Sequence, residues 1–514
     1  MNAELPQLLI YSPTQQMPFL SRLIKERNGL EDWVALLPVE EAKEPEKNLS
    51  LLVYPDKIVF PIDRSDITPP YLLPDLPFSE EHFMASVLLR LVHVEQAMEF
   101  VENGSSLYLH FLAFMHFITG EEVPGYLLDF LSKPDSYQGK EAFKAAHNRA
   151  VCLHYNPMEE EYPVEEISRL YEQALDLAED ENDRTFTLKH YAVFLMDTGR
   201  EQKAEALLRD VRESALTSIA RHDIQHALAH VLLYRLSSDY DSFTMGELRS
   251  LLKEVLDYKR SLGNKVKEAI CLLDVSQAAL LAKSYSESLG FVNKAIQIFQ
   301  EEDFEEFYGE ALRRKGVLLY AWAQAGNPQF FKSAMESFQK ALELFPKETA
   351  PSVYADIHHH LARIYAELPV EDSKKSLMAG LSVSSFRKAL EFFTKEEYPY
   401  EYATICTHFG NALCHFPPSL HSDHFEKALH YYREALDIRT AERFPVERAL
   451  TLLNYLEAAW NLREKQNGSY QKRFQDMWDK ANEILHLTKD ETILQEARKH
   501  IEALERLKSG AGKK

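Results

Sequence analysis

The chain has 514 residues, with 58 basic and 80 acidic side chains and a formal net charge of −22. So long a chain exceeds what a single compact core supports, and so acidic a chain does not favour nucleic acid or an anionic membrane as its partner. Its four cysteines are too few for a disulfide framework. No run approaches the ~18 uncharged apolar residues of a membrane-spanning helix, and no signal-peptide pattern opens the sequence, so we expect a cytoplasmic protein.

Residues 1–75 are predicted to form a small β-α-β-β unit. Short apolar runs indicate strands, a stretch with apolar residues at helical spacing indicates one helix, and Pro55-Asp56 is a turn signal that favours a hairpin. The segment 63–78 contains four prolines, which disfavour helix, and it is predicted to be an extended linker. The strands are expected at 8–11, 33–37, 51–54 and 57–60, and the helix at 17–27.

Helical spacing dominates the rest of the chain. We expect a helical junction over residues 76–160, an array of helix pairs over 161–508 and a disordered tail at 509–514. Within the junction, one continuous amphipathic helix is predicted over 80–102, and a helix that is apolar nearly all round over 107–117. The helices of the array are predicted at 171–177, 184–196, 202–211, 219–236, 245–261, 265–283, 286–299, 307–325, 330–345, 352–368, 376–394, 400–416, 424–440, 446–464, 471–486 and 493–507.

One motif occurs three times in the C-terminal half. Each copy opens on a proline, as in residues 351–355, and follows an amphipathic stretch that carries an anchor alanine. The anchors Ala341, Ala389 and Ala435 are 48 and 46 residues apart. A period in this range, with two helical patterns in each unit, marks a solenoid of stacked helix pairs. Such a fold makes a binding surface and rarely makes a catalytic one.

The repeats resemble the tetratricopeptide family, which places a small residue midway along each first helix. Gly316, Ala362 and Gly410 take that place here, and the resemblance implies a mainly α, right-handed α-solenoid. The longer period, over roughly residues 290–465, is similar to bacterial repeats joined to caspase-like (CHAT) protease domains, although no protease domain is visible in this sequence. The second-helix signature, an aromatic residue three positions before an alanine, is matched at Tyr171, Phe338, Phe386 and Tyr432.

In this family the first helices line a concave groove, so the resemblance implies a partner site there. Arg363 and Asn411 fall where such repeats often hold a carboxylate or a peptide backbone. An arginine can clamp a carboxylate at two points, and an amide can both donate and accept. The alternative is a row of solvated side chains without a ligand. The predicted partner-binding residues are Glu310, Arg313, Tyr320, Asp356, His359, Arg363, Thr404, Thr407, Asn411 and Glu457.

Other clusters are predicted to carry no chemistry. The densest group of histidines and cysteines lies between Cys406 and His424, but zinc needs four convergent ligands and Cys406 points away from the others. His358-His359-His360 spans three faces of a helix, and the acidic runs at 159–161 and 180–183 lack the spacing of a calcium loop. Because no acid, base and nucleophile form a convincing set, we predict no enzyme activity, no metal and no cofactor.

The sequence therefore predicts a cytoplasmic scaffold or adaptor that binds a protein or peptide partner in its concave groove. An alternative reading is a regulatory or substrate-recruiting subunit of a separately encoded maturation enzyme or protease, acting through its N-terminal unit. The sequence predicts neither nucleic-acid nor membrane binding, and it leaves the oligomeric state open.

Overall fold

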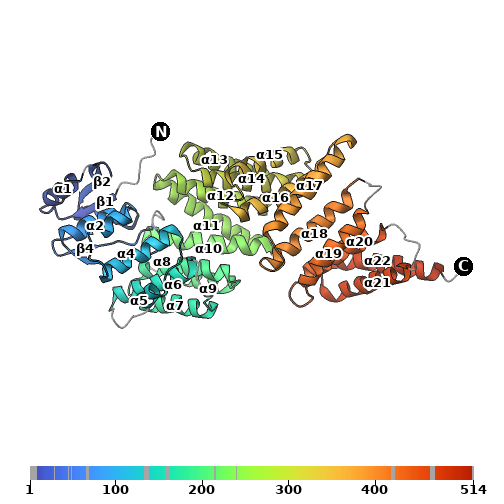
Figure 1. Ribbon diagram of the computed structural model, residues 1–514, viewed down its shortest axis with the longest axis horizontal. Coiled ribbons are helices and arrows are strands. Elements are labelled where there is room, and N and C mark those ends of the chain that lie inside the picture. Colours follow the sequence, from blue (N-terminus) through green and yellow to red (C-terminus); the bar gives the residue numbers. More distant parts are fainter. Residues whose placement is uncertain are drawn as a thin grey trace. The chain divides into compact units, whose positions relative to one another are not determined.

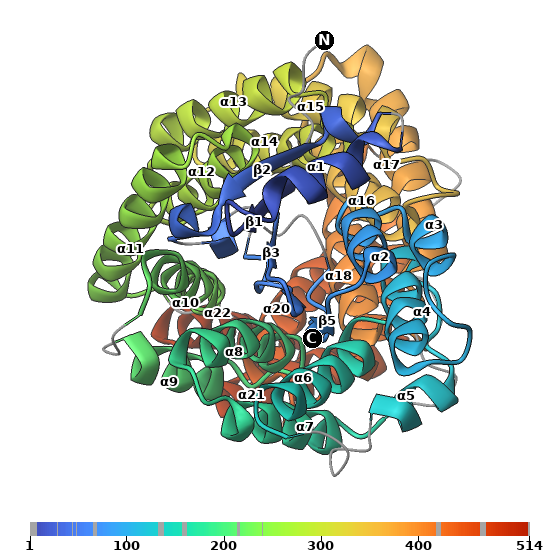
Figure 2. The same cartoon turned by 90° about the vertical axis from the view of Figure 1, so that its left-hand side faces the viewer.

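The computed structural model describes residues 8–511, except 28, 44, 48, 65–68, 132–137, 157–161, 213–215, 239, 418–422 and 463–468. Two compact units divide the chain, unit 1 at residues 1–282 and unit 2 at 283–514. Stacked helix pairs form most of each unit, and a small sheet opens unit 1 (Figures 1 and 2). The predicted tetratricopeptide-like α-solenoid with an N-terminal α/β element is thereby confirmed. Among the described residues, no helix is long and apolar enough to cross a membrane.

The N-terminal sheet has five strands in the spatial order β2-β1-β3-β4-β5. β1 pairs in parallel with β2 and β3, whereas β3, β4 and β5 are antiparallel neighbours. Helix α1 (Met17–Lys25) connects β1 to β2 and buries Leu20, Leu23 and Ile24. The predicted strands, helix and hairpin are confirmed, and β5 is an addition. The strands are β1 (Leu8–Ser12), β2 (Val34–Pro38), β3 (Ser50–Val53), β4 (Lys57–Val59) and β5 (Leu76–Pro77).

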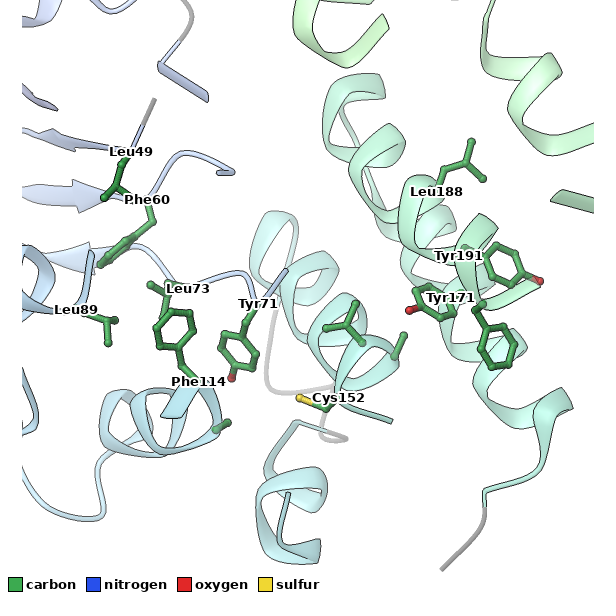
Figure 3. Close-up of a cluster of buried hydrophobic side chains, with 14 of the residues drawn as sticks. Leu49, Phe60, Tyr71, Leu73, Leu89, Phe114, Cys152, Tyr171, Leu188 and Tyr191 are labelled. Carbon is green, nitrogen blue, oxygen red and sulfur yellow. The ribbon is translucent and has the colours of Figure 1, made fainter. Parts of the chain in front are cut away.

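The segment predicted to be a linker is instead part of the core of unit 1, which corrects the prediction for residues 63–78. Its described residues are largely extended, as the prolines require, but Arg64, Tyr71 and Leu72 are only 2–5% exposed. Figure 3 shows Tyr71 within a cluster of apolar side chains that runs from the sheet to Phe114. The run 71–73, which lies between two pairs of prolines, is apolar, and removing its side chains from water into the core is favourable.

The helices of unit 1 from α8 onward follow the predicted order, whereas α5 and α6 lie in the junction, where no separate helices were predicted, and α7 begins before the predicted start at 171. The prediction of a single helix over 80–102 is wrong. The chain forms two helices there, α2 and α3, and the bend between them lies at Val92, whose φ is 64°. The predicted boundaries at 75, 160 and 508 stay predictions. The helices are α2 (Glu80–Arg90), α3 (Val94–Met98), α4 (Ser106–Thr119), α5 (Gly125–Leu131), α6 (Lys140–Tyr155), α7 (Val164–Leu177), α8 (Glu181–Asp197), α9 (Glu201–Arg212), α10 (Ser218–Ser238), α11 (Ser242–Ser261) and α12 (Lys265–Leu281).

Unit 2 contains the three matching repeats. α16, α18 and α20 each begin with the proline of the repeated motif, whose fixed φ and missing N–H suit the first turn of a helix. α22 extends to Ala511, past the predicted start of the tail at residue 509. The helices are α13 (Tyr285–Glu301), α14 (Glu305–Gln324), α15 (Phe330–Leu344), α16 (Pro351–Glu367), α17 (Asp372–Phe392), α18 (Pro399–His415), α19 (His424–Ile438), α20 (Pro445–Trp460), α21 (Ser469–Leu487) and α22 (Glu491–Ala511).

Close packing inside the pairs confirms the predicted register of unit 2. A Cβ atom at Gly316 would lie 2.8 Å from the ring of Phe338, and one at Gly410 would lie 2.5 Å from the ring of Tyr432. Only glycine lets α14 and α18 approach their partners so closely. The anchor alanines Ala341, Ala389 and Ala435 are 0% exposed, as expected for residues at the centre of each pair.

Candidate functional site

The first helices of successive pairs lie side by side in each unit, and we call them the inner helices. In unit 1 they are α6, α8, α10 and α12, and in unit 2 they are α14, α16, α18 and α20. Figure 2 shows α6, α8 and α10 as neighbours. Side chains on these helices are the candidates for partner binding, and the two units use them differently.

In unit 1 the inner helices already hold a segment of their own chain. The guanidinium of Arg64 donates from Nη1 to Oδ2 of Asp223 at 3.0 Å, and from Nη2 to Oγ1 of Thr185 at 2.9 Å and to the carbonyl of Asn182. Lys267 on α12 donates to the Arg64 carbonyl at 3.3 Å. One buried arginine from the N-terminal segment thus ties α8, α10 and α12 together.

Residues 70–75 of the same segment are held by α6. Asn148 grips Leu72 at two points, because its Oδ1 accepts from the Leu72 N–H and its Nδ2 donates to the Leu72 carbonyl, both at 2.7 Å. Nε2 of His147 donates to the Pro70 carbonyl at 2.7 Å. Lys144 Nζ lies 2.7 Å from Oδ1 of Asp75. The inner helices of unit 1 therefore bind an extended, proline-containing segment through its backbone and one carboxylate.

Unit 2 has a cavity of about 750 Å³ at the corresponding helices α16, α18 and α20. Three of the predicted partner-binding residues, Arg363, Asn411 and Glu457, line it together. Its lining carries charges of both signs and several amides, so it suits a polar, extended ligand. The other lining residues are Gln324, Ala366, Glu367, His408, Ala412, Cys414, His415, Phe425, Tyr432, Asn454, Ala458 and Asn461.

The key side chains of this cavity are positioned by aromatic neighbours. The guanidinium of Arg363 lies 4.8 Å from the ring centroid of Tyr320, whose hydroxyl donates to Glu367 at 2.7 Å. Burial is the main cause that raises the pKa of Tyr320 above its usual range, so this hydroxyl keeps its proton. The hydroxyl of Tyr432 donates to Oδ1 of Asn411 at 2.7 Å, which fixes the amide and leaves its NH₂ group as the natural donor to a ligand.

The predicted residues nearer the start of each inner helix are engaged within the protein. Arg313 pairs with Oδ2 of Asp356 at 2.9 Å across α14 and α16, and with Oε2 of Glu310 at 2.6 Å on its own helix. These three side chains form a network that connects two repeats. Glutamate and arginine three positions apart on one helix face are natural partners, and the sequence already carries this signal.

Two threonines from the predicted set also have structural partners. Arg439, at the end of α19, donates to Oγ1 of Thr407 at 3.1 Å, of Thr451 at 2.9 Å and of Thr404 at 3.0 Å. Thr407 is only 8% exposed, so it supports Arg439 instead of presenting a hydroxyl to solvent.

His359 and His408 face each other across α16 and α18. Nε2 of His359 lies 2.8 Å from Nδ1 of His408. Burial holds the pKa of His359 at about 3, and it also moves the pKa of His408 well below its usual value. Both rings are therefore neutral at physiological pH, so one ring donates an N–H and the other accepts it.

Sequence reasoning missed part of the cavity lining. Glu367, His415 and Asn461 lie four residues after Arg363, Asn411 and Glu457, one helical turn further along the same face. That spacing was the available signal. The histidine and cysteine cluster between Cys406 and His424, for which no chemistry was predicted, includes His421, which lies outside the described residues.

Comparisons with known proteins concern the architecture. No family model and no curated protein sequence matches the chain. A Rap protein complexed with competence and sporulation factor has a TM-score of 0.42 at 15% identity, over 70% of this chain and 96% of that one. The human IFIT1 dimer with m7Gppp-AAAA has a TM-score of 0.41 at 15% identity, over 83% of this chain and 89% of that one.

An archaeal structure gives a similar result. The signal transduction ATPase (STAND) protein with a tetratricopeptide repeat sensor from Pyrococcus horikoshii has a TM-score of 0.47 at 13% identity, over 94% of this chain and 82% of that one. At these values the likeness describes helical repeats alone, and the ligands of those proteins carry no conclusion for this chain.

Proposed function

We propose that this chain is a scaffold that binds an extended protein or peptide segment on the inner helices of unit 2. The observation that carries the proposal is internal to the molecule. Unit 1 holds residues 70–75 through Lys144, His147 and Asn148 on an inner helix. Unit 2 presents groups of the same kinds around its cavity.

The positions of these groups support the comparison. Lys144 and His147 stand six and three residues before the fully buried Ala150 of α6. Asp356 and His359 stand six and three residues before the fully buried Ala362 of α16. Asp356 and His359, which pair with Arg313 and His408, thus mark the face of α16 that corresponds to the segment-holding face of α6. We infer that a partner crosses this face and meets Arg363 and the NH₂ group of Asn411.

A capture experiment tests the proposal. The full-length chain is used to capture partners from its native host, and each captured protein is then purified and titrated against the chain. Replacing Arg363 and Asn411 together by alanine should weaken binding by ~1–3 kcal/mol, the usual scale for hydrogen bonds with a charged group. Binding should also weaken as salt rises, because exposed charges are screened over ~8–10 Å.

A charge-matched control is available on an outer helix. Arg387→Ala removes one exposed positive charge from α17 and should leave the affinity unchanged. If the double variant binds as tightly as the wild type, or if Arg387→Ala weakens binding equally, the cavity is not the site.

The finer predictions stay predictions. They are the cytoplasmic setting, the absence of enzyme activity and of nucleic-acid binding, the similarity to CHAT-linked repeats, and the alternative role as an enzyme subunit. Deleting residues 1–75 is a poor test of that alternative, because the deletion would also remove Arg64, Tyr71 and Leu72 from the core of unit 1. The double substitution of Arg363 and Asn411, compared with Arg387→Ala, is the sharper experiment because it leaves the core of unit 1 intact.

A further inference from the structure

A cluster of metal-ligand side chains lies on the inner helices of unit 1. His226 and His230 stand one turn apart on α10, and Asp274 faces them from α12. Oδ2 of Asp274 lies 2.9 Å from Nε2 of His226 and 3.0 Å from Nε2 of His230. The three candidate ligand atoms all lie within 4.8 Å of one another.

This geometry is close to what a bound metal ion requires. Bonds of ~2.0–2.2 Å to nitrogen and oxygen place neighbouring ligand atoms roughly 3–3.5 Å apart. Two histidines four residues apart on a helix present their rings on one face, which is the spacing used by zinc sites on helices. Small movements of the side chains would admit an ion at the centre of the cluster.

The burial of the three residues gives the site a closed and an open side. The side chain of Asp274 is 9% exposed and that of His226 is 17% exposed, whereas that of His230 is 51% exposed. The carboxylate therefore forms the floor, and solvent reaches the cluster past His230. Lys259 on α11 is one of the charges that act on His226, and it lies 3.9 Å from Asp223, which offsets part of its charge.

We propose that His226, His230 and Asp274 bind a divalent first-row transition metal ion. Two imidazoles and one carboxylate suit zinc, cobalt, nickel or iron(II), and three protein ligands leave further coordination positions for water or an added ligand. The ion would bridge α10 and α12 on the inner side of unit 1. This site goes beyond the proposed scaffold function and does not depend on it.

Titration of the full-length chain with cobalt(II), after treatment with a chelator, tests the proposal. The wild type should bind one ion in this site, with a visible absorption band from the bound cobalt, and its melting temperature should rise because the ion binds the folded state. Asp274→Asn and His230→Ala should each weaken binding at least about tenfold and reduce the rise in melting temperature. His230 is half exposed, so His230→Ala should fold normally, which circular dichroism can check.

His222→Ala is the matched control. His222 lies one turn before His226 on the same helix, but its ring stacks on Tyr258 with centroids 3.9 Å apart. This variant should bind cobalt as the wild type does. The proposal is wrong if the wild type binds no ion, if His230→Ala binds cobalt unchanged, or if His222→Ala loses as much affinity as His230→Ala.

Discussion

The inner helices of both units carry similar polar side chains, which contact a segment of the chain in unit 1 and line a cavity in unit 2. In unit 1 a segment of the chain itself engages Lys144, His147 and Asn148, and Arg64 from that segment is almost fully buried. In unit 2 the corresponding helices line a cavity of about 750 Å³. The first set of polar groups contributes to stability, and we propose that the second set binds a ligand.

The difference teaches how one repeat face can serve two purposes. An extended segment has unpaired backbone donors and acceptors, and an inner helix with amide, imidazole and ammonium groups can satisfy them. Once the segment belongs to the same chain, its binding is part of folding. For unit 2 we propose that the groups around the cavity satisfy the backbone of a partner segment in the same way.

Removing Arg64 should produce the largest effect. Arg64→Ala leaves Asp223 buried, at 3% exposed, without its closest cation, and breaking a buried ion pair costs ~3–5 kcal/mol. Arg363→Ala in unit 2 should cost below about 1 kcal/mol, the scale of a cation–π contact. Urea unfolding, resolved by hydrogen exchange in each unit, measures both changes. Similar losses from the two substitutions would contradict the comparison.

Filling the close contact between α18 and α19 should have an intermediate effect. Gly410→Leu forces atoms into the ring of Tyr432 and should destabilise unit 2 by ~1–3 kcal/mol. Gly380, on the exposed side of α17, has no atom within 4 Å of the position of a Cβ, so Gly380→Ala should be neutral or stabilise by up to ~1 kcal/mol. Thermal unfolding distinguishes the two, and an unchanged melting temperature for Gly410→Leu would show that the predicted register is wrong.

Acid should weaken unit 2 by a smaller amount. Burial holds the pKa of His359 at about 3 and that of His358 at about 4, whereas an unfolded histidine titrates near ~6.5. The unfolded chain therefore binds more protons than the folded one between these values, and the free energy of unfolding falls as the pH drops below ~6.5.

A substitution isolates this contribution. His359→Gln should make the loss of stability between pH 7.5 and pH 5.5 smaller by ~1.4 kcal/mol, because the unfolded ring titrates in this range and the folded ring does not. His430→Gln, on the exposed side of α19, serves as the control. Unfolding curves at the two pH values measure the difference, and an unaltered pH dependence in His359→Gln would show that this ring is not kept neutral by burial.

Periodicity explains why the helix pairs could be predicted. Apolar spacing, the anchor alanines and the prolines at Pro351, Pro399 and Pro445 are local signals, and each corresponds to an element of the structure. The glycine positions were predictable for the same reason. The break at Val92 was not, because neither glycine nor proline marks that bend.

The site was less predictable because it depends on distant contacts. The resemblance to the tetratricopeptide family placed Arg363, Asn411 and Glu457 in the groove, and all three line one cavity. It could not show that Asp356 would pair with Arg313, 43 residues away. Nor could it show that α6 would hold residues 70–75, since an apolar run between prolines does not reveal which helix covers it.

Hydrogen exchange of the full-length chain, with and without a captured partner, tests the central claim most directly. We predict that the partner slows exchange in α16, α18 and α20 and leaves residues 70–75 and α6 unchanged. The account would be contradicted if the partner instead protected α6 and released residues 70–75, because the segment would then be a displaceable occupant and unit 1 would be the binding surface.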